Sequence, residues 1–423
     1  MTARMNRRLY GLLAKRLDEA QLDEVRDPRD ARGKRWQLST LLRAALGGLL
    51  AGARSLADVE ALSERLSRPV RRLLGARRRV ADTTLRDALC SLEPGELRQP
   101  LHAIVRQAQR RKSLEPDELP FGVVSLDGKH FSLPSSDDYY AQRQTHSDEA
   151  ALVGVVRTVT ATLTSIAAQP IIDVTPIPAH TNEMGIFVLA LDRVCQAFAG
   201  RDLFRLVTYD AGACSKANAR AVRDRDLHYL FVLKSSQSSL YDEAQLWLGG
   251  RTAETADATR EDFQRGQRVV RRLYLGPATD APQGWDHLRT VVRVHCETFD
   301  ASGNLVSSDN RYLVSSLPRC RLTPEHWLLV IRRHWGVETS HQILDGAFAE
   351  DDHPWISSNP RGALVVAILR RIAYTLLTLF RSVTQRSDER RHVPWKRLML
   401  DIFTAFLTTS DDQIRGLRLR PSS

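Results

Sequence analysis

The sequence has few of the residues that mark disulfide-bonded, zinc-binding or secreted proteins. Its five cysteines among 423 residues stand singly, and none forms a C-x-x-C pair. An odd number at irregular intervals argues against a disulfide framework or a zinc knuckle and suits a reducing cytoplasm. The first twenty residues mix charge into every turn, unlike the apolar stretch of a signal peptide. We therefore expect a cytoplasmic protein.

Long uninterrupted apolar runs and glycine-rich phosphate loops are also missing. The run LLRAALGGLLAGA from position 41 is too short to span a bilayer, and LVVAILRRIAYTLLTLF from position 364 contains Arg370 and Arg371 at its centre. Both runs predict buried helices in a protein without membrane association. The segment DAGACSK lacks the spacing of a nucleotide-binding loop, which argues against an ATP- or NAD-dependent enzyme.

Positive charge is concentrated at one end of the chain. The whole protein carries a net charge of +11, and residues 1–115 contain 25 Lys/Arg against 14 Asp/Glu, so this quarter holds all of the excess. Such asymmetry is typical of a nucleic-acid-binding module joined to a separate functional body. The alternative interpretation is a basic but inert surface.

Residues 1–115 have helical spacing throughout, and we interpret them as a helical DNA-binding domain. Short apolar helices on either side of a Gly- and Arg-rich turn are typical of a helix-turn-helix reader. A small helical bundle with an arginine-rich loop would show the same pattern. The candidate DNA-contacting residues are Arg71, Arg72, Arg77, Arg78 and Arg79.

After Pro120 the apolar pattern changes to short β-branched runs alternating with helices. Residues 121–234 read as strands, a helix, a strand, a helix and a strand, which predicts an α/β fold with a mixed sheet. A β-rich block follows at 235–317, and residues 323–423 return to helical spacing.

Two aspartates stand at the apparent ends of apolar strands in this α/β region. Asp127 follows FGVVSL, and Asp210 follows LFRLVTY, each with a glycine close behind. Carboxylates at strand ends lie where α/β folds place their active sites, and paired carboxylates suit Mg²⁺. The alternative is that each aspartate only begins a turn or caps a helix.

The segment PEHWLLVIRRHWGVETSHQILDGAFAEDD predicts one helix with two contrasting faces. Its apolar face, which should be core, comprises Trp327, Val330, Val337, Leu344 and Phe348. Its titratable face comprises His334, Glu338, His341 and Asp345. A solvated outer face would look similar, and zinc bound by the histidines and Glu338 is another alternative, although the H-E-x-x-H spacing is absent.

These segments carry a resemblance to a known family. VSLDGK, VTYDAGACSKANA with HYLFVLKSSQ, and HWGVETSHQILDGAFAEDD resemble the three signature blocks of bacterial insertion-sequence DDE transposases, in the subgroup of the H-repeat-associated proteins. The resemblance implies a ribonuclease-H-like mixed-sheet catalytic core with a β-rich insertion before the last acid-bearing helix. It also implies a catalytic and metal-binding triad of Asp127, Asp210 and Glu338.

The chain departs from the wider family around the glutamate. That family often has Tyr and Arg before the glutamate and Lys seven residues after it, where this chain has Ile331, His334 and Asp345. The family's terminal-phosphate contacts therefore do not transfer directly. We expect His334 and Trp335 to face DNA instead.

The triad implies in-line displacement at phosphorus with two bound Mg²⁺ ions, for which Mn²⁺ could substitute. Lys129, Lys234 and Arg311 are candidates for holding phosphate oxygens, or could be plain surface charges. The expected function is cleavage of double-stranded DNA at element ends and strand transfer to target DNA, by a homo-oligomer assembled on DNA. The alternatives are a nuclease that lacks strand transfer and a non-catalytic or domesticated DNA-binding protein.

Overall fold

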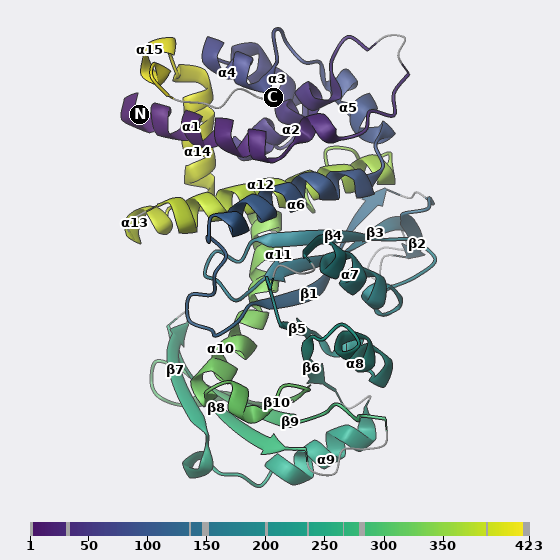
Figure 1. The fold of residues 1–423 in the computed structure, drawn as a ribbon, viewed down its shortest axis with the longest axis vertical. Coiled ribbons are helices and arrows are strands. Elements are labelled where there is room, and N and C mark those ends of the chain that lie inside the picture. Colours follow the sequence, from purple (N-terminus) through teal and green to yellow (C-terminus); the bar gives the residue numbers. More distant parts are fainter. Residues whose placement is uncertain are drawn as a thin grey trace.

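The structure is a computed structural model that describes residues 3–30, 34–134, 137–145, 152–198, 202–234, 237–264, 266–278, 284–385 and 388–417. The expected domain limits at 1, 235 and 423 lie outside these ranges. Figure 1 shows N-terminal helices stacked on a further helical layer, with the sheet below it and the β-rich strands at the far end. This mixed α/β architecture with helices before and after the sheet confirms the predicted fold class.

A mixed sheet organises the central region around β1. Its first six strands are β1 (Val123–Pro134), β2 (Ala141–Thr145), β3 (Leu152–Leu163), β4 (Ile171–Ile177), β5 (Leu206–Tyr209) and β6 (His228–Leu233). β1 pairs antiparallel with β3 and parallel with β5, which pairs parallel with β6. β2 and β4 pair with successive parts of β3. The parallel strands β1, β5 and β6 therefore bring their carboxyl ends to one edge.

The β-rich block continues this sheet and does not form a separate one. Its strands are β7 (Ala258–Gln264), β8 (Gln267–Pro277), β9 (Thr290–Phe299) and β10 (Leu305–Ser315). β10 pairs antiparallel with β6, so one sheet runs through both parts. The block also contains a helix that the sequence reading did not include, α9 (Ser238–Leu248), which packs on β8 and β9.

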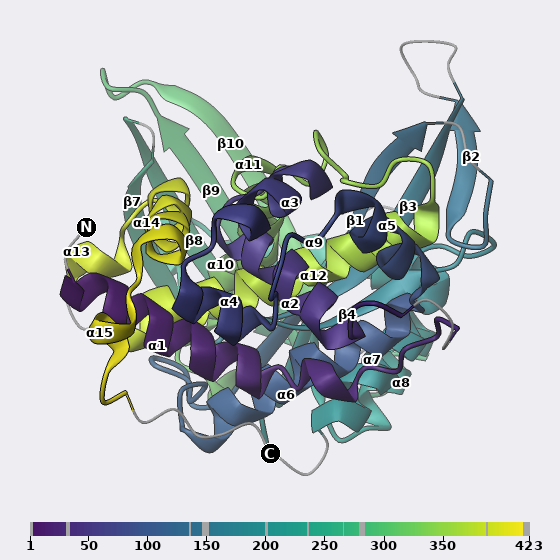
Figure 2. The same ribbon diagram turned by 90° about the horizontal axis from the view of Figure 1, so that it is seen from above.

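The helices fall into an N-terminal group and a later group. The N-terminal helices are α1 (Ala3–Glu19), α2 (Leu38–Leu50), α3 (Leu56–Arg65), α4 (Arg68–Leu74), α5 (Asp82–Ser91) and α6 (Arg98–Arg110). The later helices are α7 (Glu183–Phe198), α8 (Lys216–Arg223), α10 (Pro324–His334), α11 (Gly336–Gly346), α12 (Pro360–Leu379), α13 (Asp388–Arg391), α14 (Trp395–Thr408) and α15 (Asp411–Ile414). α12, α14 and α15 of the later group pack on the N-terminal one, with α14 and α15 returning to α1 (Figure 2).

Helix α12 joins the helical region to the sheet. It contacts α2, α5 and α6 on one side and β3 and β4 on the other. By length and composition it could cross a membrane, but its apolar window is completely buried within the protein. Both long apolar runs are thus buried helices, as predicted, since α2 is also almost wholly buried. Removing residues 1–115 would expose one side of α12.

Two elements differ from the secondary structure predicted from the sequence. β1 does not end at Asp127 but continues to Pro134, because Phe131 and Leu133 are buried in alternation with exposed neighbours. The predicted single helix is broken at Trp335 into α10 and α11. At the break, a Cβ on Gly336 would come within 2.3–2.5 Å of the amide end of the Gln169 side chain, so a larger residue there would displace that side chain.

A buried ion pair fastens α6 to the sheet. The Asp173 carboxylate, on β4, accepts two hydrogen bonds from Arg98 at 2.9 and 2.7 Å and lies 2.9 Å from His102 Nε2. Its side chain is 1% exposed. Burial alone would raise the pKa of Asp173, but hydrogen bonds from His102 and Arg98 outweigh it and lower the pKa.

Replacing this aspartate tests how firmly the layers are joined. We expect Asp173→Asn to lower the free energy of unfolding by about 3–5 kcal/mol at pH 7, because it leaves a largely buried arginine unpaired. A carboxyl with a lowered folded-state pKa stabilises above its unfolded pKa of about 3.9 and loses that contribution as pH falls further. The difference from wild type, measured by urea unfolding, should therefore shrink below about pH 4.

Asp192 is the matched control, because it pairs with Arg225 on the surface and its side chain is 37% exposed. Asp192→Asn should lower the free energy of unfolding by no more than about 1 kcal/mol. An equal loss of unfolding free energy in the two variants would contradict the conclusion that Asp173 fastens α6 to the sheet.

Candidate active site

Strand pairing brings Asp127 and Asp210 side by side. In the parallel ladder of β1 and β5, Leu126 is the partner of Tyr209, and each aspartate is the next residue along its strand. The Asp127 Oδ1 accepts a hydrogen bond from the Gly128 amide at 3.0 Å. Because β5 ends at Tyr209 while β1 continues, the two carboxylates lie where the sheet opens beside β1.

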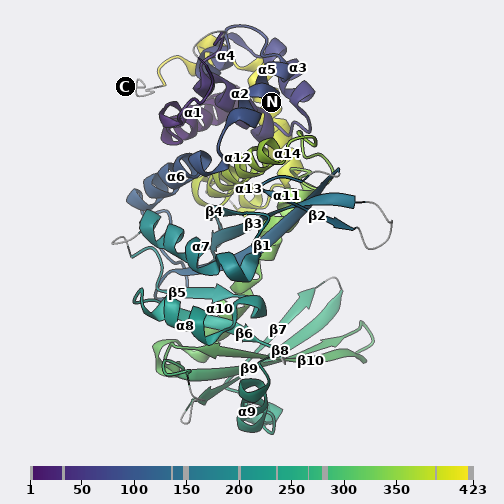
Figure 3. The same cartoon turned by 90° about the vertical axis from the view of Figure 1, so that its right-hand side faces the viewer.

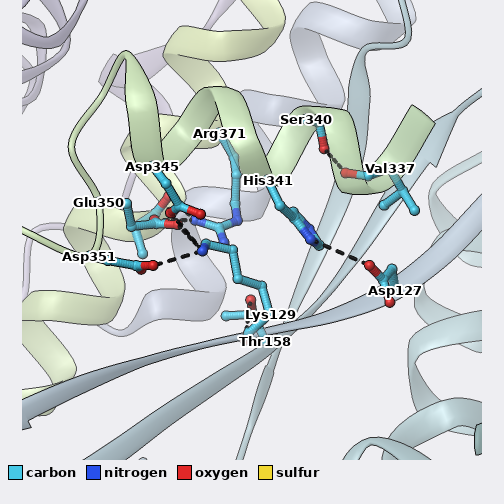
Figure 4. Close-up of polar contacts among 11 residues, drawn as sticks. Asp127, Lys129, Thr158, Val337, Ser340, His341, Asp345, Glu350, Asp351 and Arg371 are labelled. Atoms are coloured by element: carbon cyan, nitrogen blue, oxygen red, sulfur yellow. Dashed lines mark hydrogen bonds and ion pairs between the residues drawn. The ribbon is translucent and has the colours of Figure 1, made fainter. Parts of the chain in front are cut away.

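Helix α11 brings Glu338 to the same place. α11 packs on β1 and β3, and His341 Nδ1 lies 3.4 Å from Asp127 Oδ2 (Figure 4). A pocket of about 370 Å³ is lined by Asp127, Asp210 and Glu338 together. Three carboxylates from β1, the end of β5 and α11 therefore face one pocket, the geometry expected from the sequence.

A chain of polar contacts joins the two strands that lead to Asp127 and Asp210. Ser125 Oγ lies 3.0 Å from Thr164 Oγ1 and 2.7 Å from Thr208 Oγ1. Thr208 Oγ1 in turn lies 2.9 Å from His334 Nδ1, at the end of α10. All four side chains are buried. The contacts tie β1, β5 and α10 together, and His334 at their end lines the pocket.

Negative charge accumulates around these residues. Burial and the charge of Asp127 raise the pKa of Glu338, while Arg311 acts in the opposite direction. Glu183, the first residue of α7, also has a raised pKa, from burial and from Asp127, with Arg157 opposing. Its carboxylate rests against Gly128, where a Cβ would lie 1.8 Å from Oε1.

Glu183 is a residue of this site that was not predicted from the sequence. An acid in the first turn of a helix is ordinarily explained by the helix dipole, so the sequence offers no reason to single it out. Its only sequence signal is that it follows the N-cap Asn182, whose side chain accepts from the Gly185 amide at 3.0 Å. Glu183 lies next to Gly128 because α7 packs over the sheet, and the local sequence does not predict this packing.

The candidate phosphate-binding residues fall into two groups. Lys234 and Arg311 line the pocket, with Lys234 Nζ 3.9 Å from Asp210 Oδ2 and the Arg311 guanidinium 4.8 Å from the centre of the Trp335 ring. Trp335 is half-buried at the same rim. Lys129, by contrast, is 8% exposed, and its ammonium is held by carboxylates away from the pocket.

His334 lines the pocket but is largely buried. It is 7% exposed, and burial lowers its pKa, so the neutral ring is favoured. Its Nδ1 is engaged by Thr208. This position gives His334 little surface for DNA and makes it a support for β5.

The N-terminal arginines are divided between structural contacts and open surface. Arg71 is half-buried and donates to the Leu66 carbonyl at 3.0 Å, and Arg72 pairs with Asp411. The remaining three, in the segment between α4 and α5, are exposed: Arg77, Arg78 and Arg79. Arg79 pairs with Glu60 at 3.1 Å, and Arg78 lies over the Trp36 ring.

The donor chemistry at the pocket fits a divalent cation. Asp127, Asp210 and Glu338 offer hard carboxylate oxygens, the ligands that Mg²⁺ prefers. Within the part of the chain that the structure describes, no three acids, histidines or cysteines are close enough together to hold one ion. These side chains would therefore move together on binding a cation. The same lack of a preformed cluster among the described residues applies to the zinc alternative, in which the histidines and Glu338 would hold the ion.

The sheet order and the three carboxylates define the class of protein. A mixed sheet with acids on neighbouring parallel strands and on a helix packed beside them is a ribonuclease-H-like arrangement. The family profile described as Transposase DDE domain matches residues 119–376, and one described as DDE_Tnp_1-associated matches residues 20–104. The chain belongs to this DDE-type insertion-sequence transposase family. No curated protein compared with it gives a match.

The mutual influence of the carboxylates can be measured in the metal-free protein. We expect Asp127→Asn to lower the pKa of Glu338, because it removes one of the charges that raise it. The pKa should stay above its usual value, about 4.3, because burial persists. Titration of ¹³C-labelled glutamate carboxyls by NMR gives the value.

Asp412→Asn is the control, since its side chain is 80% exposed on α15 and pairs with Arg415. The control should leave the pKa of Glu338 unchanged. An unchanged pKa in Asp127→Asn would mean that the two carboxylates do not share a pocket in solution.

Proposed function

We propose that this protein is a metal-dependent transposase that cuts double-stranded DNA at the ends of a mobile element and joins the freed 3′-hydroxyl to target DNA. The observation that carries the proposal is the convergence of Asp127, Asp210 and Glu338 on one pocket in a chain of the DDE family. Two Mg²⁺ ions, or Mn²⁺ in their place, would activate the attacking oxygen and stabilise the leaving oxygen.

The residues around the pocket have two proposed roles, metal binding and phosphate binding. Asp127, Asp210 and Glu338 would hold the cations through their carboxylate oxygens. The nucleophile is water in the cut and a DNA 3′-hydroxyl in the joining step, so no nucleophilic side chain is required. Lys234 and Arg311 stand at the rim, where their positive charges can hold phosphate oxygens.

The shape of the molecule supports DNA binding across this face. Strands β2 and β3 and the β9–β10 hairpin extend beyond the body toward the same side (Figures 2 and 3). Trp335 and Arg311 stack at the pocket rim, offering a ring face and a cation to nucleic acid. We propose that a homo-oligomer assembles on DNA and that the protein works in the cytoplasm.

Alanine at each triad position separates catalysis from binding. Asp127→Ala, Asp210→Ala and Glu338→Ala should each reduce cleavage and joining below detection, because alanine supplies no oxygen ligand. Metal-free DNA affinity should persist or rise, because an acid that repels phosphate is removed. The assay incubates purified protein with a labelled element end in Mg²⁺ and counts cleaved and joined products separately.

Asp352→Ala is the control for that series, because Asp352 is an exposed acid beyond α11, and it should keep activity. Cleavage without joining by the wild type would favour the nuclease. Binding with neither product would favour a non-catalytic DNA-binding protein. Joining by Glu338→Ala would exclude the three-carboxylate mechanism.

The exposed arginines between α4 and α5 should supply part of the non-specific DNA affinity. Replacing Arg77, Arg78 and Arg79 together with Ala should reduce the slope of log affinity against log salt concentration by about 3, if each neutralises one phosphate. Fluorescence anisotropy between 50 and 200 mM salt, about the range over which such contacts weaken, measures the slope. Arg205→Ala, an exposed arginine before β5, is the control. An unchanged slope in the triple variant would place the DNA contact elsewhere.

A further inference from the structure

Lys129 stands two residues after Asp127 on β1, yet it does not behave as a surface lysine. Its side chain is 7% exposed, and Nζ lies 2.7 Å from Asp345 Oδ1 and 3.3 Å from Asp351 Oδ1 (Figure 4). A buried ammonium is retained only where carboxylates compensate its lost hydration. The lysine therefore binds β1 to α11 and to the turn that follows α11.

The contacts along β1 and α11 match in spacing. His341 lies beside Asp127 and Asp345 beside Lys129, on the same side of the strand. Two strand residues span about 6.6 Å, and four helical residues rise about 6 Å. One sliding step of α11 along β1 would break both contacts, and it would also move Glu338, which lies one turn before His341.

A second set of contacts anchors this arrangement to the rest of the protein. Glu350 Oε2 is 4.0 Å from Lys129 Nζ, and Glu350 Oε1 is 2.5 Å from Arg371 Nη1 on α12. The Glu350 and Arg371 side chains are completely buried. Lys129 is thus connected through Glu350 to α12, the helix that packs against both the sheet and the N-terminal helices.

We propose that Lys129 is a positioning residue of the active site: its ammonium fixes α11 in register with β1, so that Glu338 is held opposite Asp127. This role rests on the proposed function, because it concerns the metal-binding carboxylates. It differs from a phosphate contact, since the ammonium is engaged by three acids and turned away from the pocket. Lys129 acts on the carboxylates through α11.

The test compares Mn²⁺ binding by electron paramagnetic resonance in the full-length, DNA-free protein. Lys129→Met keeps the length of the side chain but removes its charge, and we expect the Mn²⁺ dissociation constant to rise about 10–100-fold. Lys129→Arg, which keeps the charge, should restore most of the affinity. Asp345→Asn weakens the same contact from α11, and combining it with Lys129→Met should add little further loss.

The salt dependence of metal-free DNA binding distinguishes positioning from phosphate contact. Lys129→Met should leave the slope of log affinity against log salt unchanged, whereas losing a phosphate-contacting lysine lowers it by about 1. Lys234→Met, at the pocket rim, serves as the comparison for such a loss. A reduced slope with unaltered Mn²⁺ affinity in Lys129→Met would overturn the proposal.

Two further outcomes are decisive. If Lys129→Met lowers only the midpoint of thermal unfolding and binds Mn²⁺ as the wild type does, the lysine is an ordinary buried ion-pair partner and the proposal fails. If Lys129→Met does not fold, Asp345→Asn decides, since the Asp345 side chain is 37% exposed and tolerates the change. A wild type that binds no Mn²⁺ would contradict the proposed function itself.

Discussion

Repulsion between carboxylates is the constraint on which the central region depends. Asp127, Asp210 and Glu338 line one pocket, and the charges of both aspartates contribute to raising the pKa of Glu338. Like charges repel more strongly the closer they lie and the less water screens them. The parallel ladder of β1 and β5 holds the two aspartates against this repulsion. Glu338 comes from a helix, so its position needs separate support.

That support reaches Glu338 through two layers of the protein. α11 rests on β1, and its following turn is bound through Glu350 to Arg371 of α12. α12 is in turn covered by α2, α5 and α6, and Asp173 fastens α6 to β4. The helical layers thus stabilise the geometry of the pocket, although none of the N-terminal helices lines it.

Much of the fold could be predicted from the sequence, and so could the two aspartates at the pocket, because strands followed by aspartates form a local pattern. Glu338 was singled out from the titratable face of its helix only by the resemblance to the family. The spacing of apolar residues indicated three features: the strands that precede the aspartates, the apolar face of the helix at 324–348 and the buried helical runs. The burial of Lys129 and His334 could not be predicted, because it depends on contacts with Asp345 and Thr208, far away in the chain. The break at Trp335 was not predicted either, because the sequence does not show that Gly336 packs against Gln169.

The same packing changes how the basic N-terminal region should be understood. The charge asymmetry of residues 1–115 suggested a module that acts apart from the core. In the structure these helices share one hydrophobic cluster with α12, and α14 and α15 close over α1. A region joined over a buried interface cannot turn independently, as one on a flexible linker could. The distance between the exposed arginines at 77–79 and the carboxylate pocket is therefore set by the fold itself.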